Sequence, residues 1–248
     1  MIASLMMYQR PELVEVNLRY WALIRKYLLE AGMDSPPELS QDAEPFSVWT
    51  SADLVLSQTC GMPYRLWLHD KVQLVGTPDY GVTGCSPGEY RSAIVVSRDD
   101  PRKSLDEFQG ARFAYNQDHS QSGYAAPYWH LHLLGFWFED RLQTSQHLLS
   151  ARSVAEGTSD IAALDAVSWR LIKRYEPFAE QLRVIDWTEP TPGLPLITGR
   201  DNDPETVFMA VESAISALSD QDRRALLLKG ITKIPATRYL SIPNPPRT

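Results

Sequence analysis

The stretch Asn116–Gly135, which reads NQDHSQSGYAAPYWHLHLLG, is a small polar loop followed by an apolar segment. The apolar segment Tyr124–Leu134 predicts a buried helix, and Gly135 is placed to end it. The residues SQSG at Ser120–Gly123 precede the helix, where unpaired N–H groups and the positive end of the helix dipole lie. Hydroxyls and a glycine at this point favour an anion site. An ordinary N-cap is the alternative, because serine often has that role.

Length and composition leave several functions open and argue against others. The chain has 248 residues, of which 44% are hydrophobic and 22% charged, as is usual for a soluble globular protein. This length suits one large domain or two modest ones. The net charge of -7 argues against nucleic acid or an anionic membrane as the main partner, because both call for a basic surface. A small anion is compatible with it, since a local site can be positive in an acidic protein.

The sequence predicts no membrane insertion, because no apolar run approaches the roughly 18–20 residues of a membrane span. The first residues, MIASLMMYQRPE, lack the basic start and the long apolar centre of a signal peptide. The sequence as written therefore predicts a cytoplasmic protein, or a periplasmic one if a leader was removed.

The cysteines and histidines do not indicate a metal site. Cys60 and Cys85 are the two cysteines, and they form neither a C-x-x-C motif nor metal-ligand spacing. Free thiols are expected, and a disulfide only if the chain is exported. His130 and His132 are two residues apart, so on a helix they point away from each other. We predict neither a cofactor nor a metal.

Strand and helix patterns alternate along the chain, which predicts an α/β fold. The opening strand Ile2–Tyr8 leads into a helix at Glu12–Ala31, where apolar residues recur at helical spacing before Gly32. The tail from Pro235, with four prolines, reads as an irregular wrap or a loose end. Further strands are expected at 46–50, 53–58, 72–75, 90–97, 112–115, 160–164 and 182–187, and further helices at 148–157, 167–175, 204–218 and 220–228.

Two extended segments suggest how the chain is divided. Tyr90–Ser97 and Leu182–Thr198 bracket a middle block that has βαβ units of its own. We therefore expect residues 1–88 and 191–248 to form one lobe and residues 89–190 to form the other, joined by two strand-like hinge segments. A small ligand is expected in the cleft between the lobes, where small-molecule sites often lie.

Several motifs occur in an order that resembles a known family. They are DLVLSQTCG at 53–61, SLDEFQGARFAYN at 104–116, the SQSG loop with Ala126-Pro127 after it, and AEGTSDIAALD at 155–165. Together with the opening strand and long helix, they resemble the periplasmic phosphate, phosphite and phosphonate-binding proteins, the substrate-binding components of ABC transporters. The resemblance covers most of the chain. It implies the two-lobed type 2 periplasmic-binding fold.

The resemblance also implies capture of a tetrahedral oxyanion. The family's loop maps onto Ser120–Gly123, where Gln121 would contact the ligand by its amide or its backbone. Asp165 would accept a proton from a protonated phosphonate oxygen or bind an amino group, although it also fits the N-cap of the helix after it. The ligand residues expected on this basis are Ser120, Gln121, Ser122, Gly123, His147, Asp165, Tyr8 and Tyr64.

The leading hypothesis is therefore a solute-binding protein that captures a phosphonate, phosphite or phosphate-like anion and catalyses no reaction. Its partners would be that small ligand and an ABC transporter permease. A cytoplasmic enzyme on the same fold, using an activated His147 or Cys60, is one alternative. A ligand sensor that passes occupancy to a partner is another. No catalytic triad or P-loop motif supports an enzyme.

Overall fold

The computed structural model describes residues 1–246, which fall into two compact units. Unit 1 comprises Met1–Glu89 and Pro192–Ile242, and unit 2 comprises Tyr90–Thr191 together with the tail from Pro243. Residues 243–246 thus cluster with unit 2, whereas residues 191–248 were predicted to belong to the first lobe. The physical reason is a contact in unit 2, where the Trp129 indole N–H donates to the Pro243 carbonyl at 2.9 Å.

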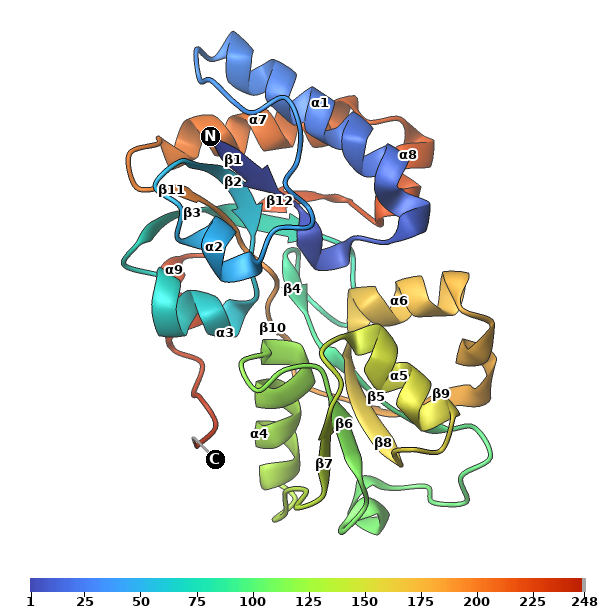
Figure 1. Ribbon diagram of the computed structural model, residues 1–248. Coiled ribbons are helices and arrows are strands. Elements are labelled where there is room, and N and C mark those ends of the chain that lie inside the picture. Colours follow the sequence, from blue (N-terminus) through green and yellow to red (C-terminus); the bar gives the residue numbers. More distant parts are fainter. Residues whose placement is uncertain (247–248) are drawn as a thin grey trace. The chain divides into compact units, whose positions relative to one another are not determined.

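Unit 1 contains a five-stranded sheet of mixed direction (Figure 1). Its strand order is β1-β2-β11-β3-β12, with β1 parallel to β2 and with β11 antiparallel to both β2 and β3. Edge strand β12 pairs antiparallel with β3. The strands are β1 (Ile2–Ser4), β2 (Leu54–Gln58), β3 (Val72–Asp79), β11 (Leu196–Gly199) and β12 (Gly230–Thr232).

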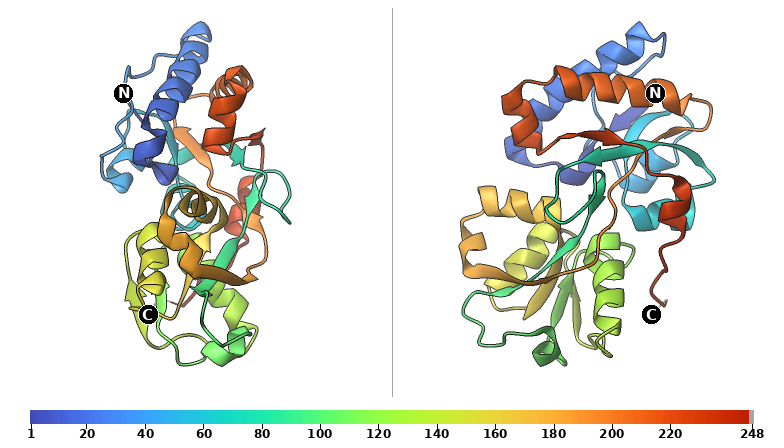
Figure 2. Two further views of the ribbon diagram at one scale, coloured as in Figure 1. Left: turned by 90° about the vertical axis from the view of Figure 1, so that its right-hand side faces the viewer. Right: turned by 180° about the vertical axis from the view of Figure 1, so that it is seen from behind.

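Helices cover both faces of this sheet. On one face α1 and α7 pack together, as Figure 2 also shows, and bury a core that includes Trp21, Ile24 and Val211. On the other face α2 and α9 contribute Trp49 and Tyr239 to a second core. The helices of unit 1 are α1 (Val14–Glu30), α2 (Pro45–Trp49), α3 (Gly61–Pro63), α7 (Pro204–Ala217), α8 (Asp220–Leu226) and α9 (Ala236–Leu240).

Helix α1 ends where the sequence predicted a stop. Gly32 has φ +78°, a left-handed conformation that favours glycine. The Met33 N–H donates to the Leu28 carbonyl at 2.9 Å, and the Gly32 N–H donates to the Leu29 carbonyl at 3.0 Å. These two bonds form the Schellman motif, which satisfies carbonyls that the helix leaves free.

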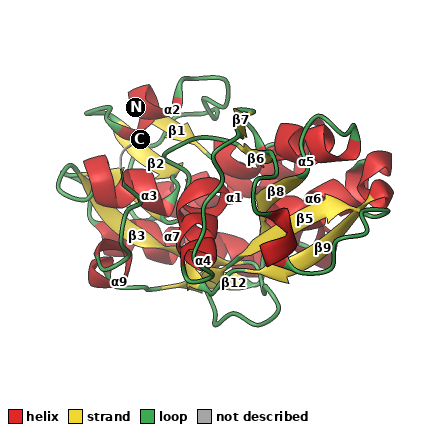
Figure 3. Ribbon diagram, turned by 90° about the horizontal axis from the view of Figure 1, so that it is seen from below, coloured by secondary structure: helices red, strands yellow, loops and turns green. Residues whose placement is uncertain are grey.

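Unit 2 contains a second five-stranded sheet, of order β7-β6-β8-β5-β9 (Figure 3). Strand β6 runs parallel to β7 and β8, whereas β5 runs antiparallel to β8 and β9. The elements are β5 (Ser92–Ser97), β6 (Phe113–Tyr115), α4 (Ala126–His132), β7 (Arg141–Gln143), α5 (His147–Ala155), β8 (Ile161–Asp165), α6 (Ala166–Tyr175) and β9 (Leu182–Trp187).

Alternation along β5 explains the two cores of unit 2. Ala93 and Val95 pack with α5 and α6 on one face, and Ile94 and Val96 pack with α4 residue Leu131 on the other. Successive strand residues point to opposite faces, so a wholly apolar strand indicates burial on both sides. Figure 1 shows α4 on one side of this sheet and α5 and α6 on the other.

The predicted hinge segments are for the most part strands of the sheet in unit 2. Tyr90–Ser97 supplies β5 and Leu182–Trp187 supplies β9, and the two strands pair with each other. The chain passes between units at the short paired strands β4 (Glu89–Tyr90) and β10 (Thr191–Pro192). After each passage of the chain from one unit to the other, the next long strand lies in the interior of the sheet that it joins. This strand is β5 in unit 2 and β11 in unit 1.

Three local predictions were wrong in whole or in part. The opening strand was predicted at Ile2–Tyr8, but β1 ends at Ser4 and Met6–Tyr8 form a 3-10 helix. Residues 46–50 were expected to be a strand, but Pro45–Trp49 form helix α2. Glu44 caps α2 by accepting from the Ser47 N–H at 2.8 Å, and Pro45 occupies its first turn. The tail from Pro235 was expected to be irregular, but it contains α9, whose Tyr239 is fully buried and hydrogen-bonded to Thr77.

None of the helices formed by residues 1–246 is both long and apolar enough to cross a membrane.

Candidate functional site

The loop Ser120–Gly123 opens a helix at the edge of unit 2, as the sequence predicted. The Ser120 hydroxyl oxygen accepts a hydrogen bond from the Gly123 N–H at 3.0 Å and caps the helix. The first turn, Gln121–Ala125, is wider than an α-helical turn, and α4 continues from it. The predicted buried helix extends only to His132, because Leu133 and Leu134 are exposed and Gly135, at φ +88°, ends the turn.

The loop is held against the sheet by a buried serine. The Ser92 hydroxyl, at the start of β5, donates to the Ser122 carbonyl at 2.8 Å. The Ser92 N–H in turn donates to the Thr188 hydroxyl oxygen at 2.9 Å. Ser120, Gln121 and Ser122 are all nearly fully buried. The first turn of this helix is therefore fixed before any ligand binds.

Gly123 is required by a close approach to two neighbouring side chains. A Cβ atom at this position would lie 1.9 Å from Asn116 Oδ1 and 3.2 Å from His147 Cε1. Asn116 Oδ1 is buried and has no hydrogen-bond partner in the described residues. Any larger residue at 123 would displace Asn116 or His147.

His147 lies beside the loop, at the first residue of α5. Its Nε2 is 3.1 Å from the Ser122 hydroxyl oxygen. Burial lowers the pKa of His147 to about 4, and the nearby Ala163 carbonyl opposes this shift only in part. Within residues 1–246, no group makes a hydrogen bond of good geometry to Nδ1. His147 is therefore a neutral imidazole at pH 7 and supplies no positive charge.

Asp165 is the last residue of β8 and caps helix α6. Its Oδ1 accepts from the Val167 N–H at 2.7 Å and from the Ser168 N–H at 2.9 Å. The N-cap alternative for Asp165 is thus confirmed, and a ligand role remains a prediction. Asp165 pairs with Ser92 across β8 and β5, so one strand pair carries Asp165 and the serine that holds the loop.

The structure brings six of the predicted residues together in unit 2, and it places the other two in unit 1. Tyr8 ends a short 3-10 helix, Met6–Tyr8, and makes an edge-to-face contact with Tyr80 at 5.1 Å between ring centroids. Tyr64 is 2% exposed and packs against Tyr239, and burial raises the pKa of its hydroxyl. Tyr64 therefore has a packing role in unit 1, whatever its role toward a ligand.

Ser92 and Asn116 were missed by the reading of the sequence. Ser92 stands directly before four apolar residues at the start of its strand, and this position was the available signal. Asn116 was quoted as the start of the loop, but its contact with Gly123 depends on the folding of the six residues between them. No sequence pattern indicates that contact.

The residues that bear metal-ligand chemistry do not form a metal site. In the described part of the chain, no three His, Cys, Asp or Glu side chains are grouped so as to hold a metal ion. His130 Nε2 lies 2.9 Å from Asp186 Oδ2, and His132 stacks on Tyr128. Cys60 and Cys85 are not joined by a disulfide.

Comparison with solved structures identifies the fold. PhnD1 from Prochlorococcus marinus in complex with methylphosphonate has a TM-score of 0.71 at 18% identity, over 96% of this chain and 94% of that one. A binding protein component of an ABC phosphonate transporter from Pseudomonas aeruginosa has a TM-score of 0.67 at 15% identity, over 94% and 80%. A histidine kinase sensor domain with similarity to periplasmic binding proteins has a TM-score of 0.59 at 16% identity, over 94% and 96%. The predicted type 2 periplasmic-binding-protein fold is confirmed.

No curated protein matches the chain in sequence. A family model does match, over residues 57–238, and its description is ABC transporter, phosphonate, periplasmic substrate-binding protein. The chain therefore belongs to the phosphonate family of periplasmic substrate-binding proteins of ABC transporters.

Proposed function

We propose that this protein captures a small tetrahedral oxyanion, a phosphonate, phosphite or phosphate-like compound, at the Ser120–Gly123 loop. One observation carries the proposal, the fixed position of Ser122 in the first turn of the helix. Its carbonyl is held by Ser92 at 2.8 Å, and its hydroxyl oxygen lies 3.1 Å from His147 Nε2. The Ser122 N–H and hydroxyl thus form a preorganised pair of donors at the positive end of a helix.

Recognition at this loop relies on neutral groups. The loop contains no arginine or lysine, and His147 is neutral at pH 7 because burial lowers its pKa to about 4. The charge of the anion is met by N–H groups, by hydroxyls and by the helix dipole, the chemistry that binds phosphate groups at many helix N-termini. Binding should therefore not depend on protonation of His147 above about pH 5.

Asp165 is the proposed second group for ligand discrimination. A carboxylate only accepts hydrogen bonds, so it favours a protonated phosphonate oxygen or an amino substituent. Its Oδ1 also accepts the Val167 and Ser168 N–H groups of α6, so a ligand contact would be made by the same carboxylate that caps the helix. The roles of Tyr8 and Tyr64, in unit 1, remain predictions from the resemblance.

The alternative of an enzyme is less well supported by the geometry. Ser122 and His147 are spaced like a nucleophile and its base, but in such pairs a third group usually orients the histidine. The group beside His147 here is the Ala163 backbone carbonyl, not the carboxylate usual in such pairs. We accordingly propose reversible binding without turnover. We also propose that the protein works in the periplasm, with an ABC transporter permease as its partner. The sensor alternative keeps some support from the histidine kinase sensor domain, which shares the fold.

The test is a thermal-shift and titration series with methylphosphonate, 2-aminoethylphosphonate, phosphite, phosphate and sulfate. A ligand at 100 times its Kd should add about 2.7 kcal/mol of stability, a shift of several degrees. Ser122→Ala should weaken the best ligand by roughly tenfold or more, because it removes a hydrogen bond to a charged group. The matched control is Ser153→Ala, a buried serine of α5 whose hydroxyl donates within its own helix.

Unchanged affinity in Ser122→Ala would refute the assignment of the loop. No stabilisation by any of these anions would refute the ligand class itself. Loss of ligand over time in the presence of the protein, followed by phosphorus NMR, would favour the enzyme alternative.

A further inference from the structure

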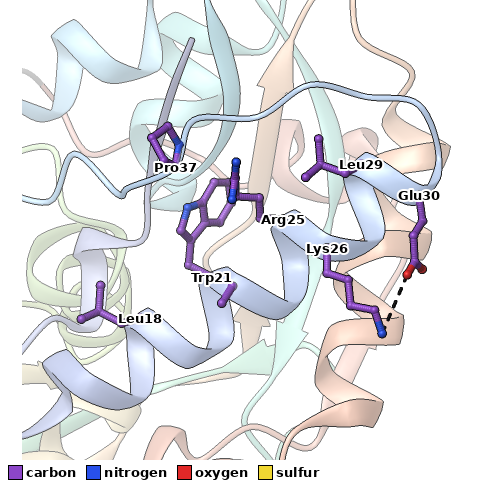
Figure 4. A pocket seen from close by; sticks show the side chains of 8 residues that line it. Leu18, Trp21, Arg25, Lys26, Leu29, Glu30 and Pro37 are labelled. Atoms are coloured by element: carbon purple, nitrogen blue, oxygen red, sulfur yellow. Dashed lines mark ion pairs between the residues drawn. The ribbon is translucent and has the colours of Figure 1, made fainter.

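A groove in unit 1 lies apart from the proposed anion loop, on the outer side of α1. It has a volume of about 450 Å³ and runs between α1 and the loop that follows this helix (Figure 4). The residues that matter to the argument are Leu18, Trp21, Ala22, Arg25, Leu29 and Pro37. Leu18 and Leu29 are 47% and 44% exposed, so two large apolar side chains line a surface open to solvent.

The second wall of the groove is tethered to unit 1 at both ends. After Gly32 ends α1, Met33 and Leu39 pack against the core of unit 1. The Ser40 N–H then donates to the Ala3 carbonyl at 2.8 Å, which fixes the end of the loop to β1. Pro37, between these anchors, faces Trp21 across the groove (Figure 4). The groove is therefore a feature of the folded unit.

Two hydrogen-bond donors beneath the groove have no acceptor. The indole N–H of Trp21 and the Nε–H of Arg25 are both buried, and neither has a partner in the described residues. Trp21 as a whole is only 2% exposed. A buried donor without an acceptor is costly, and such groups are rare in native proteins. Both unmet groups are donors, which points to a ligand that supplies acceptor oxygens.

The charges in the groove lead to the same kind of ligand. Lys26 is paired with Glu30 at 3.8 Å, as Figure 4 shows, but Arg25 takes part in no ion pair within residues 1–246. The planar guanidinium group matches a carboxylate, which it can bind through two parallel hydrogen bonds. The uncompensated positive charge of Arg25 thus selects an anion, and the apolar walls select a ligand with an apolar body.

We propose that this groove binds a small carboxylate with an apolar alkyl or aryl body. The apolar body packs against Leu29 and Pro37, and the carboxylate is held by Arg25 with the Trp21 indole N–H as a neutral donor. Trp21 and Arg25 both line the groove, and their buried N–H groups become accessible to the carboxylate when the long Arg25 side chain turns toward the ligand. A volume of about 450 Å³ is ample for such a ligand. This site does not depend on the anion loop or its function.

The test uses hexanoate and hexan-1-ol, which share an apolar body but differ in charge. The protein is labelled with nitrogen-15, and the indole N–H resonance of Trp21 is assigned by its loss in Trp21→Phe. Hexanoate should shift this resonance saturably, and hexan-1-ol should bind at least tenfold more weakly. Arg25→Gln should weaken hexanoate by roughly tenfold or more, because a charge-assisted bond is lost.

Two further variants make the test specific. Lys26→Gln is the matched control, because it removes a neighbouring cation that is already paired, and it should change the affinity less than about threefold. Leu29→Glu places a carboxylate at the exposed rim and should weaken hexanoate by repulsion. The proposal is overturned if hexanoate causes no saturable shift, if hexan-1-ol binds as tightly, or if neither Arg25→Gln nor Leu29→Glu reduces the affinity.

Discussion

Replacing Gly123 by alanine tests the packing of the anion loop directly. The added methyl group would lie 1.9 Å from Asn116 Oδ1, far inside contact distance, and 3.2 Å from His147 Cε1. The side chain of Asn116 has to move, and its movement toward His147 is restricted. Overpacking of this kind costs about 1–3 kcal/mol. For a chain of this size that corresponds to a fall in melting temperature of roughly 2–12 °C.

The assay is a double-mutant cycle read by chemical denaturation and by methylphosphonate titration. Asn116→Ala alone should cost little, because Oδ1 makes no hydrogen bond in the described chain. In Gly123→Ala with Asn116→Ala the methyl group has room, so most of the lost stability should return. The expected coupling between the two sites is about 1–2 kcal/mol, within the range for residues in direct contact. Methylphosphonate affinity should fall in Gly123→Ala and recover at least in part in the double variant.

Two results would refute this reasoning. If Gly123→Ala is as stable as the wild type, the loop has enough freedom to absorb the methyl group and is not preorganised. If Asn116→Ala fails to restore stability, the strain lies in the backbone of the turn and not in the contact with Asn116.

Two further predictions concern the neighbours of the loop. Asp165→Ala should destabilise the protein by about 1–2 kcal/mol in urea denaturation, because the first-turn N–H groups of Val167 and Ser168 lose their cap. Asp165→Asn keeps an acceptor oxygen and should therefore lose clearly less stability. Equal losses in the two variants would contradict the capping role. His147 has its pKa lowered from 6.5 to about 4, so unfolding favours its protonation, and its contribution to stability is complete above pH 6.5 and is lost as the pH falls toward 4. The loss should approach about 1.4 kcal/mol per pH unit and be missing from the pH profile of His147→Gln; identical profiles would show that His147 is not desolvated.

The fold class was predictable because it depends on regularities within short windows. Helical spacing in Glu12–Ala31 and the apolar run at 93–96 within Tyr90–Ser97 each identify an element without knowledge of its neighbours. The structure has α1 and β5 at these places. The order in which the strands pair was harder to predict from the sequence. Strand β11, for example, lies between β2 and β3 in the sheet, although more than 100 residues separate β11 from either strand in the sequence.

The wrong predictions at 46–50 and in the tail have different causes. The segment Phe46–Thr50 is short and apolar, so periodicity cannot separate a strand from a buried helix turn. Two residues favour the helix: Glu44 caps its first turn, and Pro45 suits the first helical position. The tail was judged by its prolines, but Tyr239 is fully buried against Tyr64 and bonded to Thr77, so packing orders it.

The candidate site shows where prediction from sequence ends. A serine before a helix is read equally well as a cap or as an anion ligand, and in the structure Ser120 is the cap. The second serine of the loop is held differently, because Ser92 fixes the Ser122 carbonyl while the Ser122 hydroxyl oxygen lies 3.1 Å from His147 Nε2. The division of roles between the two serines depends on a strand nearly 30 residues earlier in the chain. It follows that Ser120→Ala should mainly lower the stability of the protein, whereas Ser122→Ala should mainly lower its affinity for the anion. The S-x-S-G motif alone does not predict this difference between the two serines.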